Sequence, residues 1–239
     1  MNYRIISIII MIVFFSSCHI IRSPFDGAAS KSLSFKENFD SKGYFNSNWE
    51  DDSWDSPASY SLEGGYLKIM TRPQTKDRVK TKSKRSNFGI GSYKWRIYVP
   101  SFDLNDQCSI GAFLYHSGEI EYELDFEIGS GTNEHRNELY AEANEAIVYC
   151  TSHKKPYQTN RFLLETEMWH DFAINLKKGK RRHYIVEWYI DDVLVKTLQT
   201  KIKMNITFSI HNSLENLEFV GDQLPIRGNY VLFDQFIFE

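Results

Sequence analysis

A strict alternation of acidic and apolar residues runs through the middle of the sequence, from residue 119 to residue 128. The acidic positions are Glu119, Glu121, Glu123, Asp125 and Glu127. The apolar positions are Ile120, Tyr122, Leu124, Phe126 and Ile128. Because successive side chains of a β-strand point to opposite faces, the pattern predicts a strand that buries the apolar set and carries five carboxylates on its other face.

Short alternating or apolar runs recur along the rest of the chain, whereas long runs with a 3.6-residue period are scarce. They predict strands over residues 66–70, 91–99, 109–115, 120–128, 137–143, 170–176, 184–190, 193–200, 205–210 and 230–238. Turn-forming residues separate many of them, such as Asp191-Asp192. The pattern favours an all-β protein, a two-sheet β-sandwich with no required helix, and nothing indicates a second domain.

The charge balance of the chain bears on its partners. The sequence has 28 Lys and Arg residues against 31 Asp and Glu residues, a formal net charge of -3. A general nucleic-acid-binding protein needs a net basic surface, so we expect no nucleic-acid partner. Aromatic residues make up 15% of the chain, a content typical both of strand-rich proteins and of sugar-binding clefts.

The N-terminal residues have the pattern of an export signal. A start carrying Arg4 precedes an apolar run over residues 5–15, which is too short to span a bilayer because a spanning helix takes about 20 residues. We therefore predict a signal peptide over residues 1–17, a flexible tether over residues 18–34 and a single folded domain over residues 35–239.

Cys18 directly follows two serines, and the segment resembles a bacterial lipoprotein signal. That resemblance implies lipid attachment to Cys18 and anchoring to the bacterial outer membrane, with this lipid as the only membrane contact. The alternative is an ordinary signal peptide and a secreted or periplasmic protein. The other two cysteines, Cys108 and Cys150, could pair in an exported chain or remain buried thiols, and the sequence leaves both outcomes open.

The row of carboxylates carries an electrostatic cost, because no basic residue interrupts it. An ordinary solvated face and a calcium site are two explanations, since carboxylate oxygens are calcium ligands. Sugar chemistry is the third. The Cα atoms of Glu123 and Glu127 would lie ~13 Å apart, and their side chains would narrow the gap to ~5–6 Å, close to the ~5–5.5 Å of a retaining glycosidase. With Asp125 between them, one of the three carboxyl groups should hold a proton near neutrality.

The segment Glu123-Leu124-Asp125-Phe126-Glu127 resembles the Glu-x-Asp-x-Glu signature of family 16 glycoside hydrolases. The similarity continues through residues 85–96, 169–172 and 186–192, and it spans the chain from about Phe39 to the C-terminus. It implies a concanavalin-like jelly-roll β-sandwich of two curved antiparallel sheets, with a sugar cleft across the concave sheet. It also implies that Glu123 is the nucleophile, that Asp125 orients it and shares protons, and that Glu127 is the general acid/base.

Substrate-binding candidates come from the same resemblance and from one loop. Residues 209–212 align with a family segment that places Asn and Trp against substrate, and His211 stands at the Trp position. Glu142 stands where the lichenase-like pattern has a Tyr, and the polar loop of residues 51–57 offers an aromatic platform. The candidates are Arg85, Trp54, Tyr140, Glu142, His211 and Asn212. Some family members also hold a structural calcium, and Asp234 and Gly65 fall near those places.

Together these features predict an exported, monomeric, endo-acting retaining β-glycanase that hydrolyses β-glucan-type polysaccharide by double displacement. The reaction requires no cofactor, and calcium would be structural. Two alternatives stay open. One is a transglycosylase on the same site, in which a sugar hydroxyl replaces water. The other is a carbohydrate-binding module without turnover.

Overall fold

The computed structural model describes residues 34–54, 56–57 and 59–239. The predicted signal peptide of residues 1–17, Cys18 and the tether as far as residue 33 lie outside the described residues. Within the described part, no helix combines the length and the apolar character that crossing a bilayer requires.

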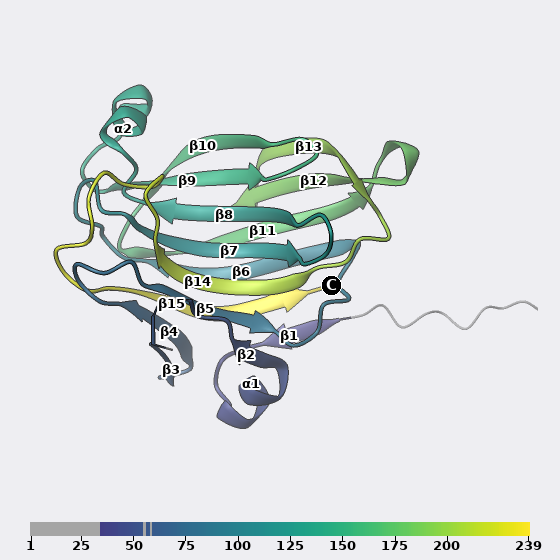
Figure 1. The fold of residues 1–239 in the computed structure, drawn as a ribbon, viewed down its shortest axis with the longest axis horizontal. Coiled ribbons are helices and arrows are strands. Elements are labelled where there is room, and N and C mark those ends of the chain that lie inside the picture. Colours follow the sequence, from purple (N-terminus) through teal and green to yellow (C-terminus); the bar gives the residue numbers. More distant parts are fainter. Residues whose placement is uncertain (1–33, 55, 58) are drawn as a thin grey trace, which may run out of the picture. The chain divides into compact units, whose positions relative to one another are not determined.

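Two antiparallel sheets face each other in the described part of the chain (Figure 1). Sheet A has the strand order β13-β12-β11-β6-β15-β4-β3, and β1 also pairs with β15. Its strands are β1 (Phe35–Glu37), β3 (Tyr60–Glu63), β4 (Tyr66–Thr71), β6 (Gly91–Val99), β11 (Met168–Lys178), β12 (His183–Ile190), β13 (Val193–Lys203) and β15 (Asn229–Phe238). This arrangement puts β6 and β11 near the middle of sheet A.

Sheet B has the strand order β10-β9-β8-β7-β14-β5-β2. Its strands are β2 (Trp49–Asp51), β5 (Arg78–Ser83), β7 (Cys108–His116), β8 (Tyr122–Gly129), β9 (Glu145–Ser152), β10 (Gln158–Glu165) and β14 (Ser209–Asn216). The described helices are α1 (Lys42–Asn48), α2 (Asn133–Leu139) and the 3-10 turn η1 (Lys180–Arg182). The predicted all-β jelly-roll sandwich is therefore confirmed.

The core lies between the inner faces of the two sheets. On β8 the apolar side chains from Tyr122 to Ile128 are buried, as the alternation predicts. Phe126 packs against Phe172 of β11 with ring centroids 5.1 Å apart. The indole Nε1 of Trp188 on β12 donates to the backbone carbonyl of Asp125 at 3.0 Å. Since burying such an apolar side chain contributes about 1.5–3 kcal/mol, these contacts fix β8 firmly against sheet A.

The start of the acidic strand differs from the prediction. Strand β8 begins at Tyr122, and Ile120 lies before it with 41% of its surface exposed. Glu119 and Glu121 are exposed in the same preceding segment. The shared face therefore carries three carboxylates and not five. The chain bends before Tyr122 and joins the sheet only from that residue onward.

Two other predicted strands are wrong in whole or in part. Residues 133–139 form helix α2, where residues 137–143 were expected to be extended, because the Thr132 side chain caps the helix by accepting from the backbone N–H of His135. The strand expected over residues 205–210 begins only at Ser209, since a turn precedes it, and it continues to Asn216.

Cys108 and Cys150 are buried free thiols. They lie on β7 and β9, which flank β8 on its two sides. Strands two positions apart are separated by about 9.6 Å, which is more than a disulfide can bridge. Of the two outcomes that the sequence left open, the structure has the unpaired one.

Candidate active site

Glu123, Asp125 and Glu127 leave β8 on the same face, the outer face of sheet B. Glu123 and Glu127 line one cavity of about 380 Å³. Asp125 lies between them in sequence and is fully buried beneath the cavity floor. The structure thus brings Glu123 and Glu127 to a common cavity.

Glu127 is almost fully buried, and burial outweighs the Ser109 hydrogen bond, which by itself lowers the pKa of Glu127. It accepts a short hydrogen bond from the hydroxyl of Ser109 on β7. Its cross-strand neighbour is Gly111, where an added Cβ would lie 3.3 Å from Glu127 Oε1, so the missing side chain leaves room for this carboxyl group. Burial raises the pKa of Glu127 well above its ordinary value, and the negative charges of Asp125 and Glu215 raise it further. Burial and these neighbouring charges therefore favour the protonated form of Glu127.

His153, in the loop after β9, holds Glu123 in the opposite state. Its Nε2 lies 3.2 Å from Glu123 Oε1 and 2.8 Å from Asp125 Oδ2. Burial raises the pKa of Glu123, but the hydrogen bond and charge of His153 outweigh burial, and the pKa falls below its ordinary value. The hydrogen bonds to Asp125 and Glu123 raise the pKa of His153 to about 11. The pair is therefore an imidazolium beside an ionised Glu123.

Asp125 stands between these two extremes. It accepts the backbone N–H of Thr151 on β9 at 3.1 Å as well as the hydrogen bond from His153. Burial raises the pKa of Asp125 to about 7, the hydrogen bond from His153 opposes this rise, and the charge of Glu123 adds to it. At neutral pH Asp125 can both give and take a proton.

The same cluster offers ligand atoms of Glu123, Asp125 and His153 within 4.8 Å of one another. Calcium takes six to eight oxygen ligands, whereas this set supplies two carboxylates and a ring nitrogen that already serves as their hydrogen-bond donor. The residues present therefore do not fit a calcium ion, and we assign the row no metal.

Another part of the cavity lining comes from β5, from β14 and from the segment that follows β2. Trp54, 58% exposed, bridges to Arg78, whose guanidinium lies 5.0 Å from the centre of the Trp54 ring. Arg78 and Lys80 both pair with the buried carboxylate of Glu215 on β14. All four side chains line the cavity. Trp54 therefore lines the same cavity as Glu123 and Glu127, beside a cluster of two basic side chains and one carboxylate.

His211 also lines the cavity, stacked on Phe113 with ring centroids 4.6 Å apart. Burial lowers the pKa of His211 to about 4, so the ring is neutral and its 3.7 Å approach to Asp52 is no ion pair near neutral pH. The next residue, Asn212, points to the opposite face of β14. There it accepts a hydrogen bond from Trp95 Nε1 at 3.0 Å, inside the core.

Three other predicted binding residues lie away from the cavity. The guanidinium of Arg85 lies over the Phe88 ring, 5.2 Å from its centre. Tyr140, at the end of α2, is 89% exposed, and Glu142 is exposed in the loop that follows. Of the six candidates, the structure places Trp54 and His211 beside the carboxylates and leaves Arg85, Tyr140, Glu142 and Asn212 outside the cavity lining.

The expected calcium site at Asp234 and Gly65 lies on sheet A. Phe233 pairs with Leu67, so the register places Asp234 close to the β3–β4 turn that contains Gly65. The carboxylate of Asp234 lies 3.6 Å from Arg96 Nε. A single carboxylate that already faces a guanidinium is a poor calcium ligand set, so these residues do not fit the ion.

Sequence reasoning missed His153, Ser109 and Lys80. The apolar run Ala146-Ile147-Val148-Tyr149-Cys150, which forms most of β9, was a signal for a strand ending just before His153. Ser109 and Lys80 carried no comparable signal, because only the strand order β8-β7-β14-β5 brings them into the same region of sheet B.

Comparison with solved structures finds this fold in several enzymes. A laminarinase from Flavobacterium sp. UMI-01 matches with a TM-score of 0.65 and 16% identity, over 85% of this chain and 98% of that chain. A Bacillus licheniformis β-glucanase matches with a TM-score of 0.62 and 16% identity, over 87% and 98%. The Crh5 transglycosylase matches with a TM-score of 0.63 and 13% identity, over 86% and 83%. These likenesses establish a shared fold.

No protein-family model matches the sequence, and no curated protein matches it. The chemistry of the cavity is therefore argued from its own residues.

Proposed function

We propose that the protein is an endo-acting retaining β-glycosidase that hydrolyses β-glucan-type polysaccharide. The proposal rests on one observation: two glutamates line the same cavity, and their surroundings favour opposite protonation states. Glu123 is held ionised by His153, and Glu127 is held protonated by burial. Double displacement requires this combination of a carboxylate nucleophile and a carboxylic acid.

The first step forms a covalent glycosyl-enzyme. The Glu123 carboxylate attacks the anomeric carbon and forms an ester, while the glycosidic C–O bond breaks and Glu127 gives its proton to the leaving oxygen. In the second step Glu127, now a carboxylate, removes a proton from water. The resulting hydroxyl bonds to the anomeric carbon and displaces Glu123, so both glutamates return to their starting states and no cofactor is consumed.

Asp125 and His153 act as positioning residues in this scheme. The imidazolium donates to both acidic neighbours, which orients the Glu123 oxygen that does not attack. When the ester forms, the negative charge on Glu123 disappears, and Asp125 can then keep the whole of the His153 hydrogen bond. The cluster thereby adjusts to each step without an unpaired buried charge.

The experiment is release of reducing ends from laminarin, mixed-linkage β-glucan and xyloglucan. We expect Glu123→Gln and Glu127→Gln to lose release by at least about 10³-fold while polysaccharide binding persists. Glu119→Gln is the matched control, since it removes an exposed carboxylate of the same sequence run. Unchanged release in either cavity variant, or a first product of inverted anomeric configuration, would refute the assignment.

Transglycosylation differs only in the acceptor of the second step. The shared fold with a transglycosylase makes this the alternative to test. Elongated products on addition of an acceptor oligosaccharide would favour it over hydrolysis. A binding module would instead retain polysaccharide without releasing or extending any chain.

We also propose export and lipid anchoring through Cys18 to a bacterial outer membrane, on the sequence pattern alone. Metabolic labelling with palmitate and detergent partition test this. A Cys18→Ala variant should lose label and leave the membrane fraction, whereas equal labelling of both proteins would contradict lipidation.

A further inference from the structure

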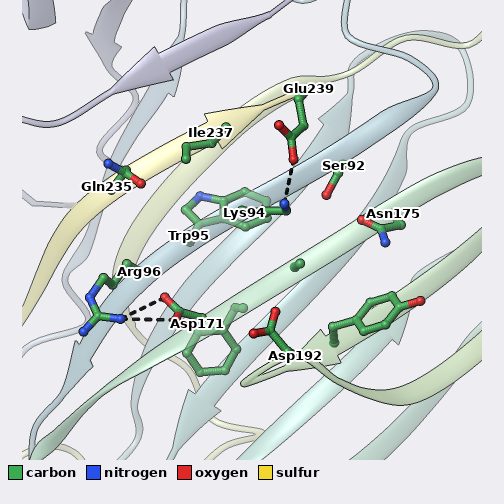
Figure 2. A pocket seen from close by; sticks show the side chains of 13 residues that line it. Ser92, Lys94, Trp95, Arg96, Asp171, Asn175, Asp192, Gln235, Ile237 and Glu239 are labelled. Carbon is green, nitrogen blue, oxygen red and sulfur yellow. Dashed lines mark hydrogen bonds and ion pairs between the residues drawn. The ribbon is translucent and has the colours of Figure 1, made fainter.

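A second hollow lies on the outer face of sheet A, on the other side of the sandwich from Glu123 and Glu127. Its volume is about 510 Å³, within the range of ligand-binding pockets. Strands β15, β6, β11 and β12 supply its lining. Figure 2 shows its side chains, with ion pairs at two places on the rim.

The hollow arises from a small side chain in the middle of the sheet. Ala173 on β11 pairs with Lys94 on β6 on one side and with Tyr189 on β12 on the other. The neighbouring Phe172 points inward to the core. Because alanine ends at Cβ, the sheet surface drops between the longer side chains of Lys94 and Tyr189.

The lining side chains are held in place by their own partners. Lys94 Nζ lies 2.6 Å from Glu239 Oε1, and Arg96 Nη1 lies 3.1 Å from Asp171 Oδ2. The hydroxyl of Tyr189 donates to Glu187 Oε2 at 2.7 Å. These partly exposed pairs favour the side-chain positions that border the hollow, which lowers the entropic cost of binding.

Two polar atoms in this lining have no partner among the described residues of the chain. They are Ser92 Oγ and Asn175 Oδ1, both buried, and the two residues are directly paired across β6 and β11. Buried polar atoms normally have hydrogen-bond partners, because leaving them unpaired is unfavourable. This adjacent hydroxyl and amide oxygen therefore offer one donor and two acceptors to a ligand.

The chemical character of the lining selects the class of ligand. Two basic side chains, Lys94 and Arg96, stand beside three acidic ones, so the lining has a small acidic excess and disfavours a polyanion. The acidic side chains are Asp171, Asp192 and Glu239. Hydrogen-bond donors and acceptors beside an aromatic ring suit a neutral, polyhydroxylated chain better than a lipid or a nucleic acid.

We infer that this hollow is a second glycan-binding site, distinct from the catalytic cavity, which holds a neutral polysaccharide strand on the outer face of sheet A. Ser92 and Asn175 would pair with sugar hydroxyls, and Tyr189 would contact a sugar ring. The inference does not depend on turnover in the cavity of sheet B. Its role is to keep the protein on an extended polymer.

Affinity electrophoresis through gels containing laminarin, mixed-linkage β-glucan or xyloglucan tests this in the Glu127→Gln background. Ala173→Phe fills the hollow, and Thr197→Phe is the matched control, an exposed residue of β13 that does not line it. We expect Ala173→Phe to weaken retention by at least about threefold, and Thr197→Phe to leave it unchanged. Equal retention of the two variants, or no retention of the parent by any of the three glycans, would overturn the site.

Ser92→Ala supplies a readout that a structural role would not give. Removing an unpartnered hydroxyl should leave the melting temperature equal or higher, yet weaken glycan retention by about threefold. A lower melting temperature with unchanged retention would overturn the inference. This variant also keeps the test decisive if Ala173→Phe folds poorly.

The two proposals fail separately. Hydrolysis of short oligosaccharides should be the same in wild type and Ala173→Phe, while the KM for polymer rises in the variant. Reducing-end release with no effect of Ala173→Phe on retention would leave the glycosidase and remove the second site. Retention that depends on Ala173, without any release, would leave the second site and remove the glycosidase.

Discussion

The imidazole Nε2 of His153 lies 2.8 Å from Oδ2 of Asp125, so a residue from the loop after β9 reaches the centre of the acidic strand. The same nitrogen lies 3.2 Å from Glu123 Oε1. One imidazolium thus sets the charge state of two carboxyl groups, and the pH response of the site should depend on it.

We expect His153→Ala to lower kcat/KM by about 100-fold near pH 6, because the nucleophile loses both its orientation and its counter-charge. Without His153 the pKa of Glu123 rises, and since Glu123 must be ionised, the acidic limb of the kcat/KM profile should move to higher pH. Profiles of wild type, His153→Ala and His153→Gln measure this. An acidic limb that stays in place while activity falls would mean that His153 does not act on Glu123.

Glu127→Gln should change stability in a pH-dependent way. The pKa of Glu127 is raised in the folded state, so the folded chain binds more protons than the unfolded chain once the pH exceeds the unfolded value of about 4.3. The free energy of unfolding of wild type should therefore fall, relative to the variant, by up to about 1.4 kcal/mol per pH unit above that value.

Thermal denaturation between pH 4 and pH 8 checks this expectation. The two melting temperatures should be similar at pH 4 and diverge as the pH rises, with the variant higher. Glu119→Gln makes the same charge change at an exposed position and should show no such divergence. Parallel curves for Glu127→Gln and wild type would contradict a neutral, buried Glu127.

Gly111→Ala should impair catalysis more than folding. The added Cβ would lie 3.3 Å from Glu127 Oε1 and would collide with the Ser213 hydroxyl, which can rotate away. We expect kcat to fall by about tenfold or more, since a small displacement of a catalytic group is costly. Gly43→Ala, at a position with nothing within 4 Å of the new Cβ, is the control. Equal kcat values in the two variants would argue against tight positioning of Glu127.

Trp54→Ala should raise the KM for polysaccharide by about tenfold, because the sugar loses ~1.4 kcal/mol of stacking on the ring. The kcat should stay within about twofold of wild type. The ring lines the same cavity as Glu123 and is more than half exposed. Trp54→Phe should recover part of the effect because it restores an aromatic face. A fall in kcat with unchanged KM would assign Trp54 a different role.

Chelation should leave the protein unaffected. Asp234 faces Arg96, and the acidic cluster of β8 is bound to His153, so neither offers a calcium ligand set. We expect EDTA to change the melting temperature and the reducing-end release by no more than the experimental error. A fall of several degrees, reversed by added calcium, would show that a calcium site exists in the chain.

The parts of the site that follow from periodicity could be predicted from the sequence. The common face of Glu123, Asp125 and Glu127 depends only on strand alternation. Ile120 was predicted to be buried in the strand but lies exposed before it. The sequence does not mark the residue at which the chain enters the sheet. Strand β5 was missed because its inward-facing residues are Val79, Thr81 and Ser83, so a buried face that is two-thirds polar gives no apolar signal.

Contacts between strands distant in sequence could not be predicted at all. His153 reaches Asp125 because β9 pairs with β8, which places Thr151 opposite Asp125. His211 and Asn212 were assigned together, yet adjacent residues of a strand face opposite ways, so only one of them lines the cavity. These contacts depend on the order of the strands in the sheet. That order cannot be derived from a single sequence.

The complete burial of Asp125 has a consequence for how hydrogen ions travel during turnover. A carboxyl group with no surface of its own cannot exchange directly with bulk solvent. Its exchange of a proton with solvent therefore needs a neighbouring group. His153, which lies 2.8 Å from Asp125 and is exposed to solvent, supplies such a neighbour.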